Sequence, residues 1–178
     1  MKKVITTLLS IAALNSNMVT ADTLDDVVDR GTLRCGVVLD FPPMGYRDAN
    51  NEPAGFDVDY CHDLAKSLEV DVKIMPLTWS ERLPVIVTGR ADVVFGSTSD
   101  SLARARTVGF SIPYAIFYSQ GVVNASSNIK TLEDIRGKRV ASALGTLPEQ
   151  EWLKIAKQWG EENLYQRPTH SIVRTIPG

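Results

Sequence analysis

The sequence predicts an α/β protein in which a mostly parallel sheet is covered by helices on both faces. Short apolar runs that suit strands alternate with segments whose apolar residues recur every three or four positions, as on one face of a helix. Strands alternating with helices at this pitch favour parallel pairing. The pattern restarts after a small polar break at 125–128, which predicts two lobes, residues 22–124 and 125–178.

The first lobe is defined by turn residues that separate periodic segments. Two prolines, at 42 and 43, end the first strand because neither can donate to a ladder. The expected elements are a helix over 22–29, a strand over 32–39, a turn over 47–53, a helix over 57–68, a strand over 70–77, a helix over 79–87, a strand over 91–95, a helix from 102 and an apolar strand over 115–123.

The second lobe is expected to be incomplete. A helical turn over 131–134, a strand over 138–143, a turn over 144–148 and a helix over 149–158 repeat the earlier pattern once. Residues 161–165 could begin another strand, and beyond 166 the pattern is lost. One strand and one helix cannot bury a core comparable to that of the first lobe.

Residues 1–21 have the pattern of a secretory signal peptide. A basic start at Lys2 and Lys3 precedes an apolar run over 4–14, and small residues precede the expected cleavage site after Ala21. The apolar run is too short to span a bilayer, and no cysteine follows it to carry a lipid anchor. We therefore expect export to the periplasm.

Composition and charge exclude several function classes. The 178 residues carry a formal net charge of −2, so neither nucleic acid nor a membrane surface is indicated as a partner. His62 and His170, the two histidines, lack metal-ligand spacing, so no metal site is expected. No catalytic residues and no cofactor are expected, since neither a nucleophile elbow nor a phosphate-binding glycine loop occurs.

The chain contains two cysteines, Cys35 in an expected strand and Cys61 in an expected helix. Such a pair is more typical of two buried thiols. A disulfide stays open as the alternative, because export makes one chemically permissible.

The most informative stretch is the polar turn over 96–101 that follows the strand at 91–95. Either Asp100 or Ser101 can cap a helix that begins near Leu102. Such a turn offers backbone N–H groups and hydroxyls at the positive end of a helix. Arg104 lies in the first turn of this helix, where its planar guanidinium can hold a carboxylate bidentately. The simpler alternative is a polar connection with a solvated arginine.

Seven short motifs, in order, give the chain its family resemblance. They are Gly-Thr-Leu-Arg-Cys-Gly-Val (31–37), Asp-Phe-Pro-Pro-Met (40–44), Gly-Phe-Asp-Val-Asp (55–59), residues 79–84, Gly-Arg-Ala-Asp (89–92), Phe-Ser-Ile-Pro-Tyr (110–114), and Gly-Lys-Arg-Val (137–140) followed by Gly145-Thr146. From about Gly31 to Trp159 the chain resembles the type II periplasmic solute-binding proteins of ABC importers, polar amino-acid family. The resemblance implies two lobes around a ligand cleft, a free amino acid as ligand, an inner-membrane ABC permease as partner, and a monomer.

The same resemblance implies a ligand site. It assigns Arg104 and Thr146 to the α-carboxylate from opposite walls, Ser97 and Ser99 to hydroxyl and backbone contacts with the zwitterion, Phe41 and Trp79 to the two sides of a slot for the ligand side chain, and Asp40 to a side-chain cation. Aromatic faces can pack an aliphatic stem or attract a cation, which leans towards a basic or polar amino acid. Core packing of Trp79 and turn capping by Asp40 remain alternatives.

The chain departs from the family pattern in its second lobe. Leu147 and Pro148 stand where the family often has a hydroxyl and a polar residue. The family's ammonium-binding aspartate lies further along than this sequence extends. The expectation is therefore a C-terminally truncated product, with uncovered apolar surface and impaired or lost hinge closure.

Two other functions remain open. One is an exported enzyme that resembles the periplasmic cyclohexadienyl dehydratases, which act on arogenate or prephenate and are implied to use an arginine-anchored carboxylate as well. The other is a sensor or interaction domain without a role in transport.

Overall fold

The structure, a computed structural model, describes residues 23–166 of the chain. Its main sheet has the strand order β4-β1-β5, formed by β1 (Thr32–Val38), β4 (Asp71–Leu77) and β5 (Val93–Phe95). Both neighbours run parallel to β1. The predicted parallel sheet is thus confirmed, and most element bounds lie within two residues of those expected.

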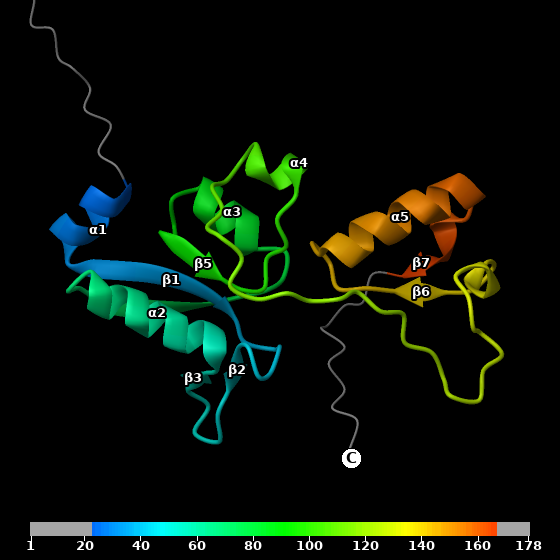
Figure 1. The fold of residues 1–178 in the computed structure, drawn as a ribbon, viewed down its shortest axis with the longest axis horizontal. Helices are drawn as coiled ribbons and strands as arrows, with labels where there is room; N and C mark the ends of the chain where they lie inside the picture. The colour runs from blue at the N-terminus through cyan, green and yellow to red at the C-terminus, as the bar shows by residue number, and fades with distance from the viewer. Residues whose placement is uncertain (1–22, 167–178) are drawn as a thin grey trace, which may run out of the picture.

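Helices cover both faces of this sheet (Figure 1). The core on one face is built from alternate residues of β1, together with α1 (Thr23–Arg30) and α2 (Phe56–Ser67). The buried side chains there are Val27, Leu33, Cys35, Val37, Val58, Cys61 and Ala65. On the other face lies α3 (Arg82–Val87), which contacts β1 and β5, and the short α4 (Leu102–Ala105) follows the turn after β5. The turn expected over 47–53 is the tip of a hairpin between β2 (Tyr46–Arg47) and β3 (Pro53–Ala54).

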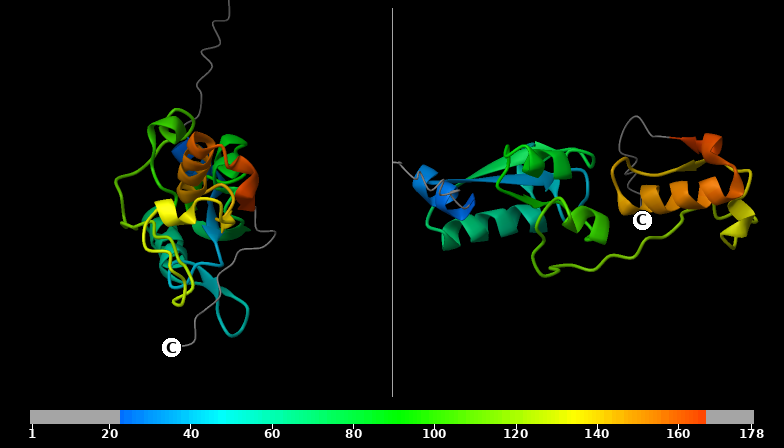
Figure 2. Two further views of the ribbon diagram at one scale, coloured as in Figure 1. Left: turned by 90° about the vertical axis from the view of Figure 1, so that its right-hand side faces the viewer. Right: turned by 90° about the horizontal axis from the view of Figure 1, so that it is seen from above.

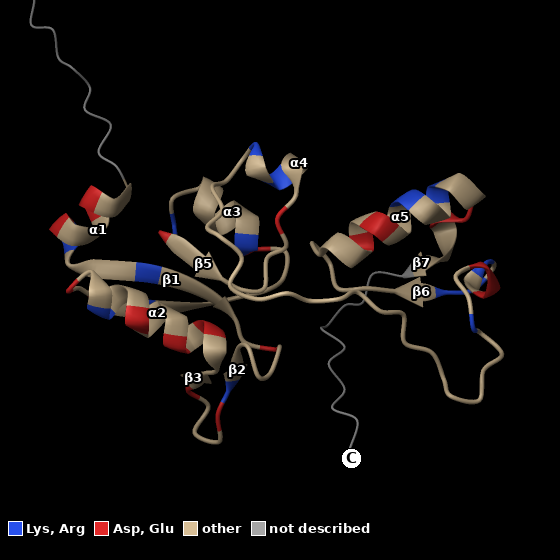
Figure 3. Ribbon diagram, in the orientation of Figure 1, with Lys and Arg blue, Asp and Glu red and all other residues tan. Residues whose placement is uncertain are grey.

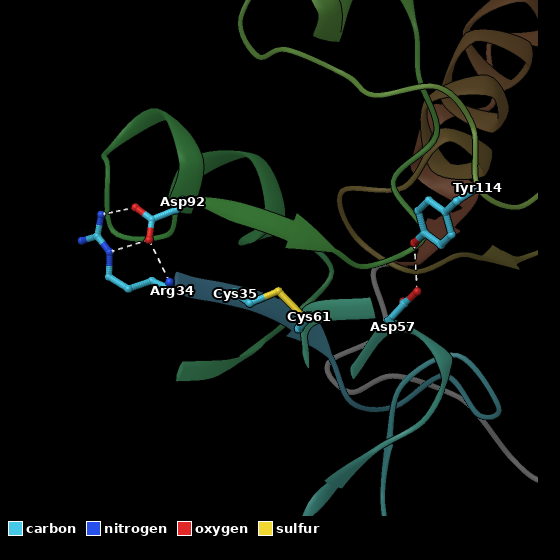
Figure 4. The surroundings of a disulfide bond; sticks show 6 residues. All are labelled: Arg34, Cys35, Asp57, Cys61, Asp92 and Tyr114. Atoms are coloured by element: carbon cyan, nitrogen blue, oxygen red, sulfur yellow. Dashed lines mark hydrogen bonds and ion pairs between the residues drawn. A yellow bond between two sulfur atoms is a disulfide. The ribbon is translucent and has the colours of Figure 1, made fainter. Parts of the chain in front are cut away.

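Cys35 and Cys61 form a disulfide, so the expectation of two buried thiols is wrong (Figure 4). Their Cα atoms lie 6.0 Å apart, within the usual range for a bridge. Both residues are fully buried where α2 packs on β1. The bridge therefore links strand and helix through the centre of the first core.

A buried carboxylate links three further elements. Asp92, just before β5, accepts hydrogen bonds from the Arg34 guanidinium at 2.6 and 3.2 Å and from the Arg34 backbone N–H at 2.8 Å (Figure 4). The Arg30 side chain donates a further bond to Asp92 at 2.6 Å. Burial opposes ionisation of Asp92, but these hydrogen bonds and the two positive charges outweigh it and lower its pKa. The cluster joins α1, β1 and β5 at the edge opposite the polar turn.

The second group of elements follows an extended connection. Strand β6 (Val140–Ala141) pairs in parallel with β7 (Tyr165–Gln166), beside α5 (Leu147–Trp159) (Figures 1 and 2). Two 3-10 turns, η1 (Glu133–Ile135) and η2 (Glu162–Leu164), complete it. Acidic residues lie in the first half of α5 and lysines in the second, which suits the helix dipole (Figure 3). Pro148 lies inside the helix at its first positions, so the turn expected over 144–148 ends earlier than predicted.

The expected strand over 115–123 is wrong. This segment is extended but pairs with none of the described strands. Several of its large apolar residues are exposed, including Ile116 (80%), Tyr118 (85%) and Val122 (87%). Apolar content indicated a strand here, but a strand needs a partner edge, which the described residues do not supply.

The described residues contain no helix long and apolar enough to cross a membrane. They also contain no group of three or more His, Cys, Asp and Glu residues that could hold a metal ion. The signal peptide expected over 1–21 lies outside the described residues, as does His170.

Candidate functional site

The three loops that carry most of the candidate residues leave the same edge of the main sheet. Because β4, β1 and β5 are parallel, their carboxyl ends lie side by side. The loop after β1 carries Asp40 and Phe41, the one after β4 carries Trp79, and the one after β5 carries Ser97 and Ser99. Ligands of open α/β sheets bind at this edge.

Arg104 is buried, with 5% of its surface exposed. The cap of its helix is Ser101, whose hydroxyl accepts the Arg104 backbone N–H at 3.3 Å, as one of the two predicted caps. The Arg104 Nη1 donates to the Ser99 carbonyl oxygen at 2.8 Å, and Nη2 donates to the Gly145 carbonyl oxygen at 3.0 Å. The guanidinium is thus not solvated, which excludes the simpler alternative.

A second buried arginine, Arg82, was missed by the sequence analysis. It is 3% exposed, and its guanidinium lies 4.9 Å from the centre of the Trp79 ring. It donates to the carbonyl oxygens of Trp79 (2.9 Å), Gly96 (2.9 Å), Ser97 (3.0 Å) and Gly145 (3.1 Å). The signal that could have identified it is an arginine at the start of an otherwise apolar helix, three residues after a tryptophan.

Both guanidiniums carry positive charge that no carboxylate of the described residues pairs with. Within residues 23–166, neither Arg82 nor Arg104 has a carboxylate at ion-pair distance. Burial, followed by the nearby charge of Arg104, lowers the pKa of Arg82 to about 10, and burial also lowers the pKa of Arg104. Asp40 opposes the shift at Arg82 through its negative charge. Two buried cations beside one carbonyl oxygen create a site that favours an anion.

The polar turn contacts both cations through its backbone oxygens and carries buried hydroxyls of its own. Ser97 has a positive φ of 48°, an uncommon backbone conformation for a residue with a side chain. Within the described part of the chain, buried polar atoms without a hydrogen-bond partner include Ser97 Oγ, Thr98 Oγ1, Arg104 Nε and Asp40 Oδ1. Such unpaired donors and acceptors are the chemistry that recognises a small polar ligand. Ser99 takes part through its backbone oxygen.

Ser97 is also connected to a pair that the sequence analysis missed, the half-buried Tyr114 and the buried Asp57. Its backbone N–H donates to the Tyr114 hydroxyl at 3.3 Å, and that hydroxyl donates to Asp57 Oδ1 at 2.9 Å (Figure 4). Burial raises the pKa of Asp57, and burial together with the Asp57 charge raises the pKa of Tyr114. This chain of hydrogen bonds ties the polar turn to the start of α2.

The two aromatic residues expected to form a slot contact each other instead. The Phe41 and Trp79 rings pack edge to face with centroids 5.4 Å apart, and the Phe117 ring lies 5.8 Å from that of Phe41. Edge-to-face packing is the favourable contact of two aromatic quadrupoles. The structure therefore brings the pair to the site but shows no slot between them.

Thr146 reaches the site region from the second group of elements. Its hydroxyl accepts the Glu149 backbone N–H at 3.4 Å as the cap of α5, and donates to the Ala143 carbonyl at 2.7 Å. The contact with the arginines comes from the preceding residue, Gly145. Its φ is +78°, and a Cβ there would lie 2.8 Å from Ser80 Cα, so only glycine allows this close approach.

A helix-covered parallel sheet with two buried arginines at its carboxyl edge defines an α/β fold whose loops lie where open sheets of this class bind ligands. Residues 33–162 match the bacterial extracellular solute-binding proteins, family 3. The chain belongs to this family.

Relatives and solved structures agree with this assignment. The L-cystine-binding protein TcyJ of Escherichia coli K12 is 35% identical over 133 residues, which are 74% of this chain and 50% of TcyJ. The cyclohexadienyl dehydratase of Pseudomonas aeruginosa is 33% identical over 106 residues, which are 60% of this chain and 40% of the enzyme. An ancestral arginine-binding protein bound to arginine is 35% identical with a TM-score of 0.68, covering 79% of this chain and 62% of that one. The chain thus spans about half or less of these two curated relatives.

Proposed function

We propose that this chain binds a free amino acid outside the cytoplasm, as the solute-binding component of an ABC importer. The observation that carries the proposal is the pair of buried arginines, Arg82 and Arg104, which have no carboxylate partner among the described residues. An amino acid supplies a carboxylate that would compensate this charge.

In the proposed complex, Arg104 holds the ligand's α-carboxylate. It has N–H groups left for this, because Nε has no partner and each Nη makes a single hydrogen bond to the described residues. Ser97 and Ser99 contribute hydroxyl or backbone contacts from the same turn, and Thr146 contributes from the turn before α5. Phe41 and Trp79 would have to separate to enclose the ligand side chain, while Asp40 offers an acceptor for a cationic group.

The proposal divides the chain into a signal peptide over 1–21 and two lobes, 22–124 and 125–178, with the ligand between them. The hydrogen bonds from Arg82 and Arg104 to Gly145 support a ligand site between the two parts, because both parts contribute to it there. The family's description as extracellular supports export. An inner-membrane permease would receive the closed form.

Isothermal titration calorimetry of the chain against the twenty amino acids tests the proposal. We expect binding of one or a few of them, and its loss in Arg104→Met but not in Arg106→Lys, a substitution at the exposed end of α4. Absence of heat with every amino acid, or equal binding by Arg104→Met, would contradict it.

A second candidate function is a dehydratase of the cyclohexadienyl type, which the likeness to the Pseudomonas aeruginosa enzyme favours. Both prephenate and arogenate carry carboxylates that Arg104 could hold. Incubation of the chain with either compound and assay for the aromatic product separates the two functions, because a binding protein gives no turnover.

A further inference from the structure

We propose that Arg82 is a positioning residue of the ligand site, which holds the turn over 96–99 and the turn over 144–146 in place around Arg104. This inference rests on the proposed function for the ligand, but the arrangement itself is a property of the chain.

The geometry of Arg82 fits a positioning role better than direct contact with a ligand. Four of the five N–H donors of a guanidinium are accounted for by backbone carbonyls, one each of Trp79, Gly96, Ser97 and Gly145. One face of the group is covered by the Trp79 ring. By contrast, Arg104 makes one hydrogen bond to the carbonyl of Ser99 and one to that of Gly145. Arg104 therefore keeps donors for a guest, whereas Arg82 has almost none.

The carbonyls that Arg82 holds belong to the turns that carry the candidate ligand groups. On one side, its Nη1 bridges the oxygens of Gly96 and Ser97 and so fixes the segment in which Ser97 has its positive φ. On the other side, its Nη2 and that of Arg104 share the Gly145 oxygen. The planar fork of arginine can span these oxygens, whereas the compact ammonium of a lysine cannot.

The Gly145 turn is held from its other side as well. The Gly145 N–H donates to Glu149 Oε2 at 2.6 Å, and Glu149 is buried. Glu149 Oε1 accepts the Tyr165 hydroxyl at 3.0 Å. Gly145 thus lies between two guanidiniums at its carbonyl and one carboxylate at its N–H. Loss of Arg82 would leave this turn with a single cation, that of Arg104.

Amide hydrogen exchange of the ligand-free chain, followed by NMR, tests the positioning directly. In Arg82→Lys and Arg82→Gln we expect the amides of Ser97 and Gly145 to exchange at least about tenfold faster, while the amides of β1 keep their protection. The matched control is Arg106→Lys, which should change neither set. Unchanged exchange at Ser97 and Gly145 would overturn the proposal. Loss of β1 protection in both Arg82 variants would also overturn it, because Arg82 would then support the whole fold rather than these two turns.

A binding measurement adds a readout that general destabilisation would not move. For each folded variant, the preference for the carboxylate is measured as a ratio, the dissociation constant of an amino acid's carboxamide over that of the amino acid itself. We expect this preference for the carboxylate to fall about tenfold in Arg82→Lys, because its turns no longer surround Arg104 correctly. An unchanged preference would count against the positioning role. If the wild-type chain binds no amino acid, the proposed function fails, and hydrogen exchange alone decides the role of Arg82.

Discussion

Reduction of the Cys35–Cys61 disulfide is expected to cost about 3.5 kcal/mol of the free energy of unfolding. The two residues are 26 positions apart, and closing a loop of this length lowers the entropy of the unfolded chain by about 12 cal/mol/K in the loop-closure treatment. The folded state should change little, because both side chains are fully buried between β1 and α2. Their neighbours in the core can hold the two thiols close together.

Urea unfolding with and without a reductant measures this cost. With a slope of about 2 kcal/mol per molar urea, the midpoint should fall by nearly 2 M on reduction. The double variant Cys35→Ala, Cys61→Ala is the control, since its midpoint should not respond to reductant. A wild-type change below about 1 kcal/mol would refute the reasoning, because loop closure would then not be the source of the stability.

Three further predictions concern ionised and constrained residues. Asp92→Asn should lower the free energy of unfolding at pH 7 by roughly 2–3 kcal/mol, because it leaves Arg30 and Arg34 without their buried carboxylate. The pKa of Asp92 is lowered in the fold, so the stability that its ionised form contributes should be lost as the pH falls through the unfolded and then the folded pKa. Urea unfolding of wild type and variant at pH 7 and pH 3 checks this, because the difference between their free energies of unfolding should shrink at pH 3. The pKa of Asp57 is raised in the fold, so its contribution to the free energy of unfolding is most favourable below the unfolded pKa and declines as the pH rises towards the folded pKa. Asp57→Asn keeps an oxygen for the Tyr114 hydroxyl and should remove this decline. Parallel profiles of stability against pH in wild type and variant would contradict the prediction. Gly145→Ala should disturb the contact with Ser80 and cost about 1–3 kcal/mol wherever the two parts unfold together, whereas Gly137→Ala, at a positive φ without a close neighbour, should show only the backbone cost; equal losses in the two variants would contradict the contact.

Local signals predicted the elements that lie close to the main core. The helix expected over 57–68 is α2 (Phe56–Ser67), and the strands expected over 32–39 and 70–77 are β1 and β4. In each case, the spacing of apolar residues reflects which face is buried. The N-cap was predicted as either Asp100 or Ser101, and the structure has Ser101, because capping depends on residues three positions apart.

Features that depend on distant segments were predicted poorly. Whether 115–123 becomes a strand depends on a partner edge, and its own apolar content carries no information about one. The pairing of Cys35 with Cys61 depends on how α2 lies against β1. The contact between Phe41 and Trp79 depends on two loops that are neighbours only through the sheet order.

The difference between Arg104 and Arg82 shows the same division within the site itself. Arg104 was identifiable because a strand, a polar turn and a capped helix N-terminus form one continuous stretch of sequence. Arg82 acquires its role from four carbonyl oxygens spread over residues 79 to 145, and no local pattern describes that set. These carbonyl oxygens nevertheless explain how two buried guanidiniums lie beside each other. Both guanidiniums donate to the Gly145 oxygen, and their other hydrogen bonds to described residues also go to backbone carbonyls instead of carboxylates. A site arranged in this way still carries its positive charge, so in the proposed complex a ligand carboxylate would gain from both arginines while touching Arg104.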